Sequence, residues 1–138
     1  MDPNIWGPPS WLFLHSVTLN YPQNPTPQDQ EDFRIFFDSL KHVLPCPTCK
    51  EHYAKNLTLK PINLKNRDTL VNWLIDVHNS VNVSNGKRKL PYQEVYDIYD
   101  DLYNGGNFLG DNKLKIYIVL GVLLLVGILI YLKNKFQK

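Results

Sequence analysis

The chain contains only two cysteines, which lie three positions apart in the segment Cys46-Pro47-Thr48-Cys49. Since there is no third cysteine, neither sulfur can belong to a separate structural disulfide within the chain. A helix N-terminus close to such a pair lowers the pKa of a thiol and so raises the fraction of reactive thiolate. The pair therefore predicts thiol–disulfide redox chemistry at the start of a short helix.

Two other uses of a Cys-x-x-Cys pair remain open at this point. A closed zinc site needs four ligands, and His52 and His78 could complete one, although no spacing pairs them. A thioredoxin-like carrier needs βαβ units beside the pair, and the sequence shows no alternating strand pattern. The residues alone favour a redox pair carried by helices over both alternatives.

The spacing of apolar residues over residues 1–103 predicts an all-α domain, a bundle of four helices plus a short fifth helix. We expect the first helix to open around Pro8 and Pro9, because proline is tolerated in a first helical turn. Thr26 is the expected N-cap of the second helix, with Asp29 in the acidic position of a capping box. Helical segments separated by prolines thus account for the whole domain.

The fourth predicted helix has the clearest pattern, with buried-type residues at steps of three and four. These residues are Leu70, Trp73, Leu74, Val77, His78 and Val81. Asn85-Gly86 is expected to close this helix, and a last short helix follows Pro91. The third helix is expected to run from the cysteine pair to Lys60-Pro61.

The C-terminal end has a different composition. Residues 116–132 carry no charge, and Lys115 and Lys133 flank them. A helix of this length spans about 25 Å, slightly less than the hydrocarbon core of a bilayer, which snorkelling lysine stems extend. We therefore predict a transmembrane helix, with residues 104–115 as a tether and 133–138 as a short basic tail.

The orientation in the membrane follows from the position of the apolar run near the C-terminus. No signal peptide is recognisable in the first residues, so we expect a single-pass protein whose folded domain faces the cytoplasm. The lysines beyond the span argue mildly for the opposite orientation. A net charge of +2, with dispersed basic residues, gives no indication of a nucleic-acid partner.

Aromatic and imidazole side chains flank the cysteine pair from distant helices. Trp11 and His15 precede it, and Trp73 and His78 follow it, with asparagines at 79 and 82. Such side chains suit a planar heteroaromatic cofactor with hydrogen-bonding edges, although aromatic residues at helical spacing also form ordinary cores. A cofactor site close to the sulfurs is one hypothesis, and plain core packing is the other.

The sequence resembles the Erv/ALR family of FAD-linked sulfhydryl oxidases in three separated blocks, which cover roughly residues 5–99. The blocks are Trp6-Gly7-Pro8 through Trp11 and His15, then Cys46-Pro47-Thr48-Cys49, then His78-Asn79-Ser80-Val81-Asn82 through Gly86-Lys87. The small size and the predicted anchor look most like the virus-encoded members. The resemblance implies a helical bundle that holds FAD against the cysteine pair and passes electrons from thiols to oxygen, giving hydrogen peroxide.

The resemblance also implies individual roles. Cys46 would meet the substrate dithiol and Cys49 would lie next to the flavin, while Lys87 would face the FAD phosphates. Tyr99 stands where the family often has tryptophan, so we expect it to stack on the adenine. The full set of expected cofactor-binding residues is Gly7, Pro8, Trp11, His15, Cys49, Trp73, His78, Asn79, Val81, Asn82, Lys87 and Tyr99.

Partners follow from the same resemblance. The chain lacks the additional shuttle cysteines of longer members, so it is expected to oxidise a partner protein directly, such as a small thioredoxin-like or Cys-x-x-Cys protein. Phe33, Phe36 and Phe37 exceed what a thin bundle buries easily. Members of this family commonly pair through their first two helices, so the resemblance implies a homodimer formed in this way, and the phenylalanines fit a dimer.

Overall fold

The computed structural model describes residues 1–105, which form five α-helices and divide into two compact units. The first unit, Met1–Tyr92, holds α1 (Pro3–Leu19), α2 (Pro27–Val43), α3 (Pro47–Leu59) and α4 (Arg67–Ser84). The helix α5 (Tyr92–Tyr103) belongs almost wholly to the second unit, which begins at Gln93. The prediction of an all-α domain with four helices and a short fifth one is confirmed for these residues.

The predicted membrane span at residues 116–132 and the basic tail lie outside the described residues. Most of the predicted tether also lies outside them. None of the helices within residues 1–105 combines the length and the apolar character that crossing a membrane requires.

The first helix begins earlier than the sequence predicted. Its N-cap is Asp2, whose carboxylate accepts a hydrogen bond of 2.9 Å from the backbone N–H of Asn4, and Pro3 occupies the first helical position. The predicted start at Pro8 and Pro9 was wrong, since both prolines lie inside the helix. Because prolines have no N–H, two carbonyls of the first turn lack a helical donor. The loss of these hydrogen bonds destabilises the helix little, since the first-turn residues Asn4 and Ile5 are exposed and water can bind their carbonyls.

The other helix ends agree with the predictions. Thr26 and Asp29 form a capping box: the Asp29 N–H donates to the Thr26 hydroxyl at 3.1 Å, and the Thr26 N–H donates to the Asp29 carboxylate at 2.8 Å. Gly86 follows α4 with φ +70°, a backbone conformation that side chains rarely tolerate. Local capping chemistry thus determines most of the boundaries.

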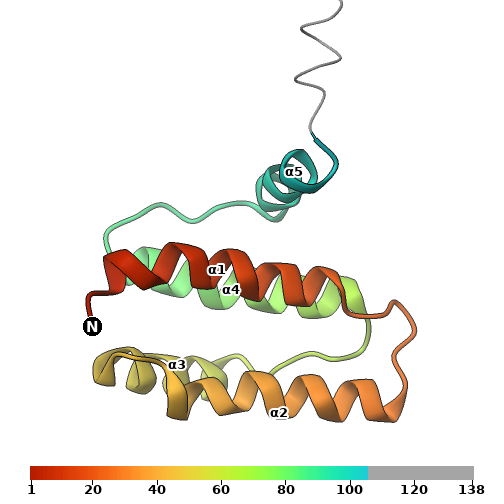
Figure 1. The fold of residues 1–138 in the computed structure, drawn as a ribbon, viewed down its shortest axis with the longest axis horizontal. Coiled ribbons are helices and arrows are strands. Elements are labelled where there is room, and N and C mark those ends of the chain that lie inside the picture. Colours follow the sequence, from red (N-terminus) through yellow and green to blue (C-terminus); the bar gives the residue numbers. More distant parts are fainter. Residues whose placement is uncertain (106–138) are drawn as a thin grey trace, which may run out of the picture. The chain divides into compact units, whose positions relative to one another are not determined.

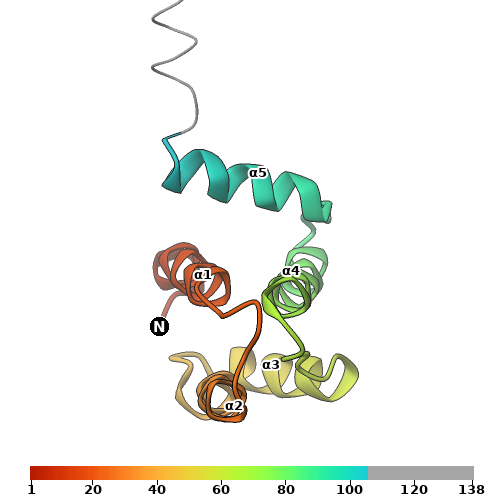
Figure 2. The same ribbon diagram turned by 90° about the vertical axis from the view of Figure 1, so that its right-hand side faces the viewer.

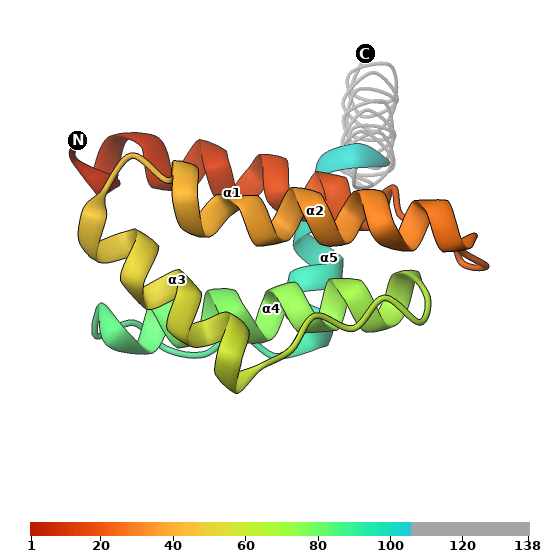
Figure 3. The ribbon, with the colours of Figure 1, turned by 90° about the horizontal axis from the view of Figure 1, so that it is seen from below.

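The four helices of the first unit are arranged in two pairs. Figure 1 shows α1 running alongside α4, with α2 and α3 on the other side. The end-on view in Figure 2 shows the same two layers. In Figure 3, α3 crosses toward α4, against which it packs.

The core of this unit is rich in aromatic residues whose polar groups are all paired. The Tyr21 hydroxyl donates to the Leu64 carbonyl at 2.9 Å, and the Tyr53 hydroxyl donates to the Phe37 carbonyl at 2.9 Å. Such pairing removes the cost of burying a hydroxyl group. The buried cluster consists of Leu14, Tyr21, Phe37, Tyr53, Leu64, Leu70, Trp73, Leu74 and Val77.

Candidate active site

The two cysteines form a disulfide at the N-terminus of α3. Cys46 is the N-cap, with an extended backbone, and its sulfur accepts a hydrogen bond of 3.3 Å from the N–H of Cys49. Pro47 occupies the first helical position, where a missing N–H costs nothing. Both cysteines are half-buried, so a dithiol can reach the pair without unfolding the helix.

This placement favours a reactive thiolate. The positive end of the α3 dipole lies at Cys46, and the Cys49 N–H already points at the Cys46 sulfur. When the disulfide is reduced, the same N–H group can donate to the Cys46 sulfur and stabilise negative charge on it. The half-buried Lys50 follows the pair directly and adds positive charge to the same helical turn.

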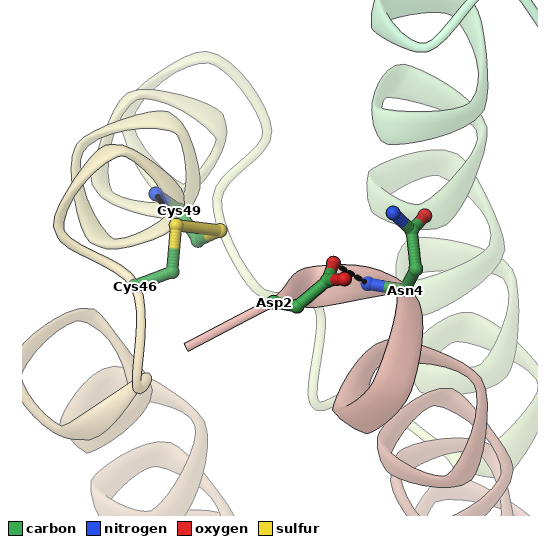
Figure 4. Close-up of a disulfide and its surroundings, with 4 residues drawn as sticks. All are labelled: Asp2, Asn4, Cys46 and Cys49. Atoms are coloured by element: carbon green, nitrogen blue, oxygen red, sulfur yellow. Dashed lines mark hydrogen bonds between the residues drawn. A yellow bond between two sulfur atoms is a disulfide. The ribbon is translucent and has the colours of Figure 1, made fainter.

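The start of α1 faces the disulfide. Figure 4 shows Asp2 and Asn4 opposite the sulfurs of Cys46 and Cys49, with the Asp2 carboxylate turned back onto its own helix. Sequence reasoning missed the role of Asp2 as the N-cap of α1. An Asp-Pro pair, which combines an N-cap with a proline at the first helical position, was the signal that could have revealed it.

Three of the predicted cofactor residues come into direct contact. The rings of Trp11 and His78 stack with centroids 3.9 Å apart and planes 5° from parallel. The His15 Nε2 lies 3.1 Å from the His78 Nδ1, so one of these atoms donates a hydrogen bond to the other. Helices α1 and α4 thus bring together residues that lie more than sixty positions apart in the chain.

Both imidazoles of this cluster are held in the neutral form. Burial, followed by the neighbouring His78, lowers the pKa of His15 from 6.5 to about 3. Burial, followed by the positive charge of Lys87, lowers the pKa of His78 to about 4. At neutral pH the cluster therefore offers a neutral ring surface and one proton shared between two facing nitrogens.

Two other predicted residues use their polar groups within the protein. Trp73 is 5% exposed, packs edge-on against Phe37, and donates its indole N–H to the Lys60 carbonyl at 2.8 Å. Asn79 is buried and binds the backbone of Leu90 through both ends of its amide. The structure does not bring these two side chains into the stack of Trp11 and His78.

The start of α1 has features that its protein neighbours do not explain. Among residues 1–105, no acceptor pairs with the buried indole N–H of Trp6. A Cβ atom added to Gly7 would meet nothing within 4 Å, although glycine inside a helix costs about 1 kcal/mol relative to alanine. An unpaired donor and an open space beside a glycine fit a site built for a flat, hydrogen-bonding group such as FAD. Pro8 is exposed on the same turn.

The remaining predicted residues lie at the end of α4 or beyond the first unit. Val81 and Asn82 are half-buried in the last turns of α4. The backbone N–H of Lys87 donates to the Asn82 carbonyl at 2.8 Å, which places this lysine beside the helix end. Tyr99 belongs to the second unit, and its predicted contact with adenine stays a prediction.

The zinc hypothesis finds no matching geometry. Within residues 1–105, no group of three or more His, Cys, Asp or Glu side chains is placed to hold a metal ion. The two cysteines are instead bonded to each other.

The sequence matches the model of the Erv1/Alr family over residues 8–100. The chain belongs to the Erv1/Alr family. A protein of Acanthamoeba polyphaga mimivirus, named as a FAD-linked sulfhydryl oxidase, is 43% identical over 100 residues, which are 70% of each chain. The Erv1/Alr domain is also 34% identical over 89 residues to the FAD-linked sulfhydryl oxidase ERV1 of Arabidopsis thaliana. That match covers 64% of this chain and 47% of the plant protein.

The fold is shared with a solved member of the Erv1/Alr family. The crystal structure of the FAD-binding domain of Erv1 from Saccharomyces cerevisiae matches with a TM-score of 0.68 and 28% sequence identity. The match covers 77% of this chain and 97% of the yeast domain. The family assignment, which rested on the three sequence blocks, and the all-α fold, which the spacing of apolar residues predicted, are both confirmed.

Proposed function

We propose that this protein is a FAD-linked sulfhydryl oxidase that forms disulfide bonds in protein substrates. The observation that carries the proposal is the accessible Cys46–Cys49 disulfide at a helix N-terminus within an Erv1/Alr fold. The relatives named as FAD-linked sulfhydryl oxidases support the same activity.

The reaction begins with thiol–disulfide exchange at the pair. A substrate thiolate attacks the Cys46 sulfur, the S–S bond breaks, and Cys49 leaves as a thiolate. The second substrate thiol then attacks the substrate sulfur of the mixed disulfide, which releases the oxidised substrate and the Cys46 thiolate. The α3 dipole and the Cys49 N–H lower the cost of negative charge on these sulfurs.

The residues gathered along α1 and the end of α4 would hold the cofactor. Trp11 and His78 offer flat ring surfaces, Trp6 offers an N–H that has no acceptor within residues 1–105, and Lys87 offers a positive charge for the phosphates. FAD bound there would supply the redox chemistry: it would take two electrons and two protons from the reduced cysteine pair and give them to oxygen, forming hydrogen peroxide.

A spectrum of the purified full-length protein tests the activity. We expect a yellow protein with flavin absorption, and one molecule of hydrogen peroxide for each disulfide formed when a dithiol is supplied. A folded, colourless protein that exchanges thiols without consuming oxygen would instead be a redox carrier, and the oxidase proposal would then fail.

We infer that the protein forms a homodimer through the outer faces of α1 and α2. Phe13 on α1 and Ile35 on α2 are each 58% exposed, and Phe13 meets Phe36 edge-on with ring centroids 6.2 Å apart. Phe37 is fully buried, whereas Phe33 and Phe36 are only partly covered. Exposed apolar surface that spans two helices supports an interface with a second copy.

Replacing Ile35 by glutamate is therefore expected to weaken the dimer at least about tenfold, because a charge would be buried at the interface. Sedimentation equilibrium measures the change. Leu59→Glu is the matched control, since Leu59 is 66% exposed on α3 and lies outside the proposed interface. Equal dissociation constants for the two variants would exclude this interface.

We further propose that residues 116–132 anchor the protein in a membrane, with the catalytic domain on the cytoplasmic side. The uncharged run and its flanking lysines support this proposal. The absence of shuttle cysteines supports direct oxidation of a small thioredoxin-like or Cys-x-x-Cys protein. Extraction by alkaline carbonate would contradict the anchor, and protection of the domain from added protease in sealed vesicles would contradict the orientation.

A further inference from the structure

The chain that follows α4 runs back along this helix and is tied to it at three levels. We call residues 85–92 the return segment. Asn85 and Gly86 make the turn bonds that close α4, and three further partners on α4 lie three positions apart, so they share one face of the helix. The pairs are Asn82 with Lys87, Asn79 with Leu90, and Asp76 with Tyr92.

The middle pair is the most specific. The Leu90 N–H donates to the Asn79 Oδ1 at 2.8 Å, and the Asn79 Nδ2 donates to the Leu90 carbonyl at 2.9 Å. The Asn79 amide supplies both an acceptor for the Leu90 N–H and a donor for the Leu90 carbonyl. A carboxylate or an apolar side chain at position 79 would leave at least one of these two Leu90 groups unpaired. Because Asn79 is only 9% exposed, an unpaired group there would also lack water.

The two outer pairs cannot replace it. Lys87 is held by a backbone bond of 2.8 Å to the Asn82 carbonyl, within the turn that ends α4. The Tyr92 hydroxyl reaches the Asp76 carboxylate at 2.9 Å, but Tyr92 is an exposed residue and water competes for this bond. Asn79 therefore provides the buried attachment of the segment that carries Lys87.

We propose that Asn79 acts as a positioning residue, which holds the return segment on α4 so that the Lys87 ammonium group stays beside the cofactor site. This inference rests on the proposed function, because it takes the phosphates of FAD as the ligand of Lys87. It gives Asn79 a different role from the direct cofactor contact predicted from the sequence. The lowered pKa of His78, to which the charge of Lys87 contributes, agrees with a lysine held close to the site.

A double-mutant cycle tests whether the effect of Asn79 on FAD affinity depends on the presence of Lys87. Apo full-length protein is titrated with FAD, and the quenching of flavin fluorescence gives the dissociation constant. We expect Asn79→Leu and Lys87→Gln each to weaken binding about tenfold, and the double variant to bind about as weakly as Lys87→Gln alone. Additive losses of about a hundredfold, or no loss in Asn79→Leu, would overturn the proposal.

Hydrogen exchange of the apoprotein provides a readout that does not depend on FAD. In Asn79→Leu we expect the Leu90 amide to exchange at least about tenfold faster than in the wild type. Asn82→Leu is the matched control, because it makes the same change about one turn further along α4. The bond from Asn82 to the return segment uses the backbone carbonyl, which this substitution keeps. This control is expected to leave the exchange of Leu90 unchanged.

Unchanged exchange of Leu90 in Asn79→Leu would contradict the inference, even if the proposed oxidase activity is correct. A wild-type protein that binds no FAD would instead contradict the proposed function, while the exchange experiment would still decide whether Asn79 holds the return segment.

Discussion

Replacing Cys49 by serine is expected to lower the rate of peroxide formation from a dithiol by a factor on the order of a thousand or more. The resting protein holds the Cys46–Cys49 disulfide, which is the group that a substrate thiolate attacks. A serine at position 49 prevents this disulfide from forming, because a hydroxyl group cannot replace a thiol in an S–S bond, so no bond remains to accept the two electrons of the substrate thiols. Cys46→Ser is expected to have an equally large effect, because each sulfur is half of the same bond.

The assay compares oxygen consumption and peroxide yield at equal flavin content. Both variants are expected to keep the fold, because the cysteines are half-buried and the core cluster does not include them. Thr58→Ser is the control, since it introduces the same residue at an exposed position further along α3 and is expected to retain full activity. More than a few per cent of wild-type activity in Cys49→Ser would mean that thiols are oxidised elsewhere in the protein.

The helices could be predicted from the sequence where their ends depend on local chemistry. The capping box of Thr26 and Asp29 involves residues three positions apart, so a short pattern contains the whole interaction. The start of α1 was predicted wrongly because the rule for a first-turn proline also fits Pro3, which follows a good N-cap at Asp2. Sequence patterns predict the type of an element better than its first residue.

The arrangement of the site was harder to predict from the sequence, because the spacing of residues along one helix does not show which side chains meet across helices. The sequence placed His15 and His78 on the right faces, but it could not predict their hydrogen bond. Trp73 has the same spacing as a cofactor residue, yet the Lys60 carbonyl satisfies its indole N–H inside the core. The roles of these side chains depend on packing between segments, which local patterns do not contain.

Acidification from pH 7 to about pH 4.5 is expected to lower the free energy of unfolding of the apoprotein by about 3–4 kcal/mol. The pKa of His15 is about 3 and that of His78 about 4 in the folded protein, against 6.5 for an ordinary histidine. Between pH 6.5 and pH 4 the unfolded chain therefore binds more protons than the folded one. The stability is fully present above pH 6.5 and is lost as the pH falls through this window.

The two histidines do not contribute equally. His15 is 1% exposed, whereas His78 is half-buried, and solvent screens part of its environment. We therefore expect the larger share of the pH dependence to come from His15. Urea denaturation followed by tryptophan fluorescence at several pH values between 7 and 4.5 measures the free energy of unfolding directly.

His15→Asn separates the effect of this histidine from the general effect of acid. The variant keeps a polar side chain but cannot take up a proton in this range, so we expect its loss of stability on acidification to be at most about half that of the wild type. Its stability at pH 7 is expected to fall as well, since the hydrogen bond to His78 is lost. His52→Gln, which removes an exposed histidine, is the control measured over the same pH range. If His15→Asn retained the full acid sensitivity of the wild type, the neutral histidine pair would not be its cause.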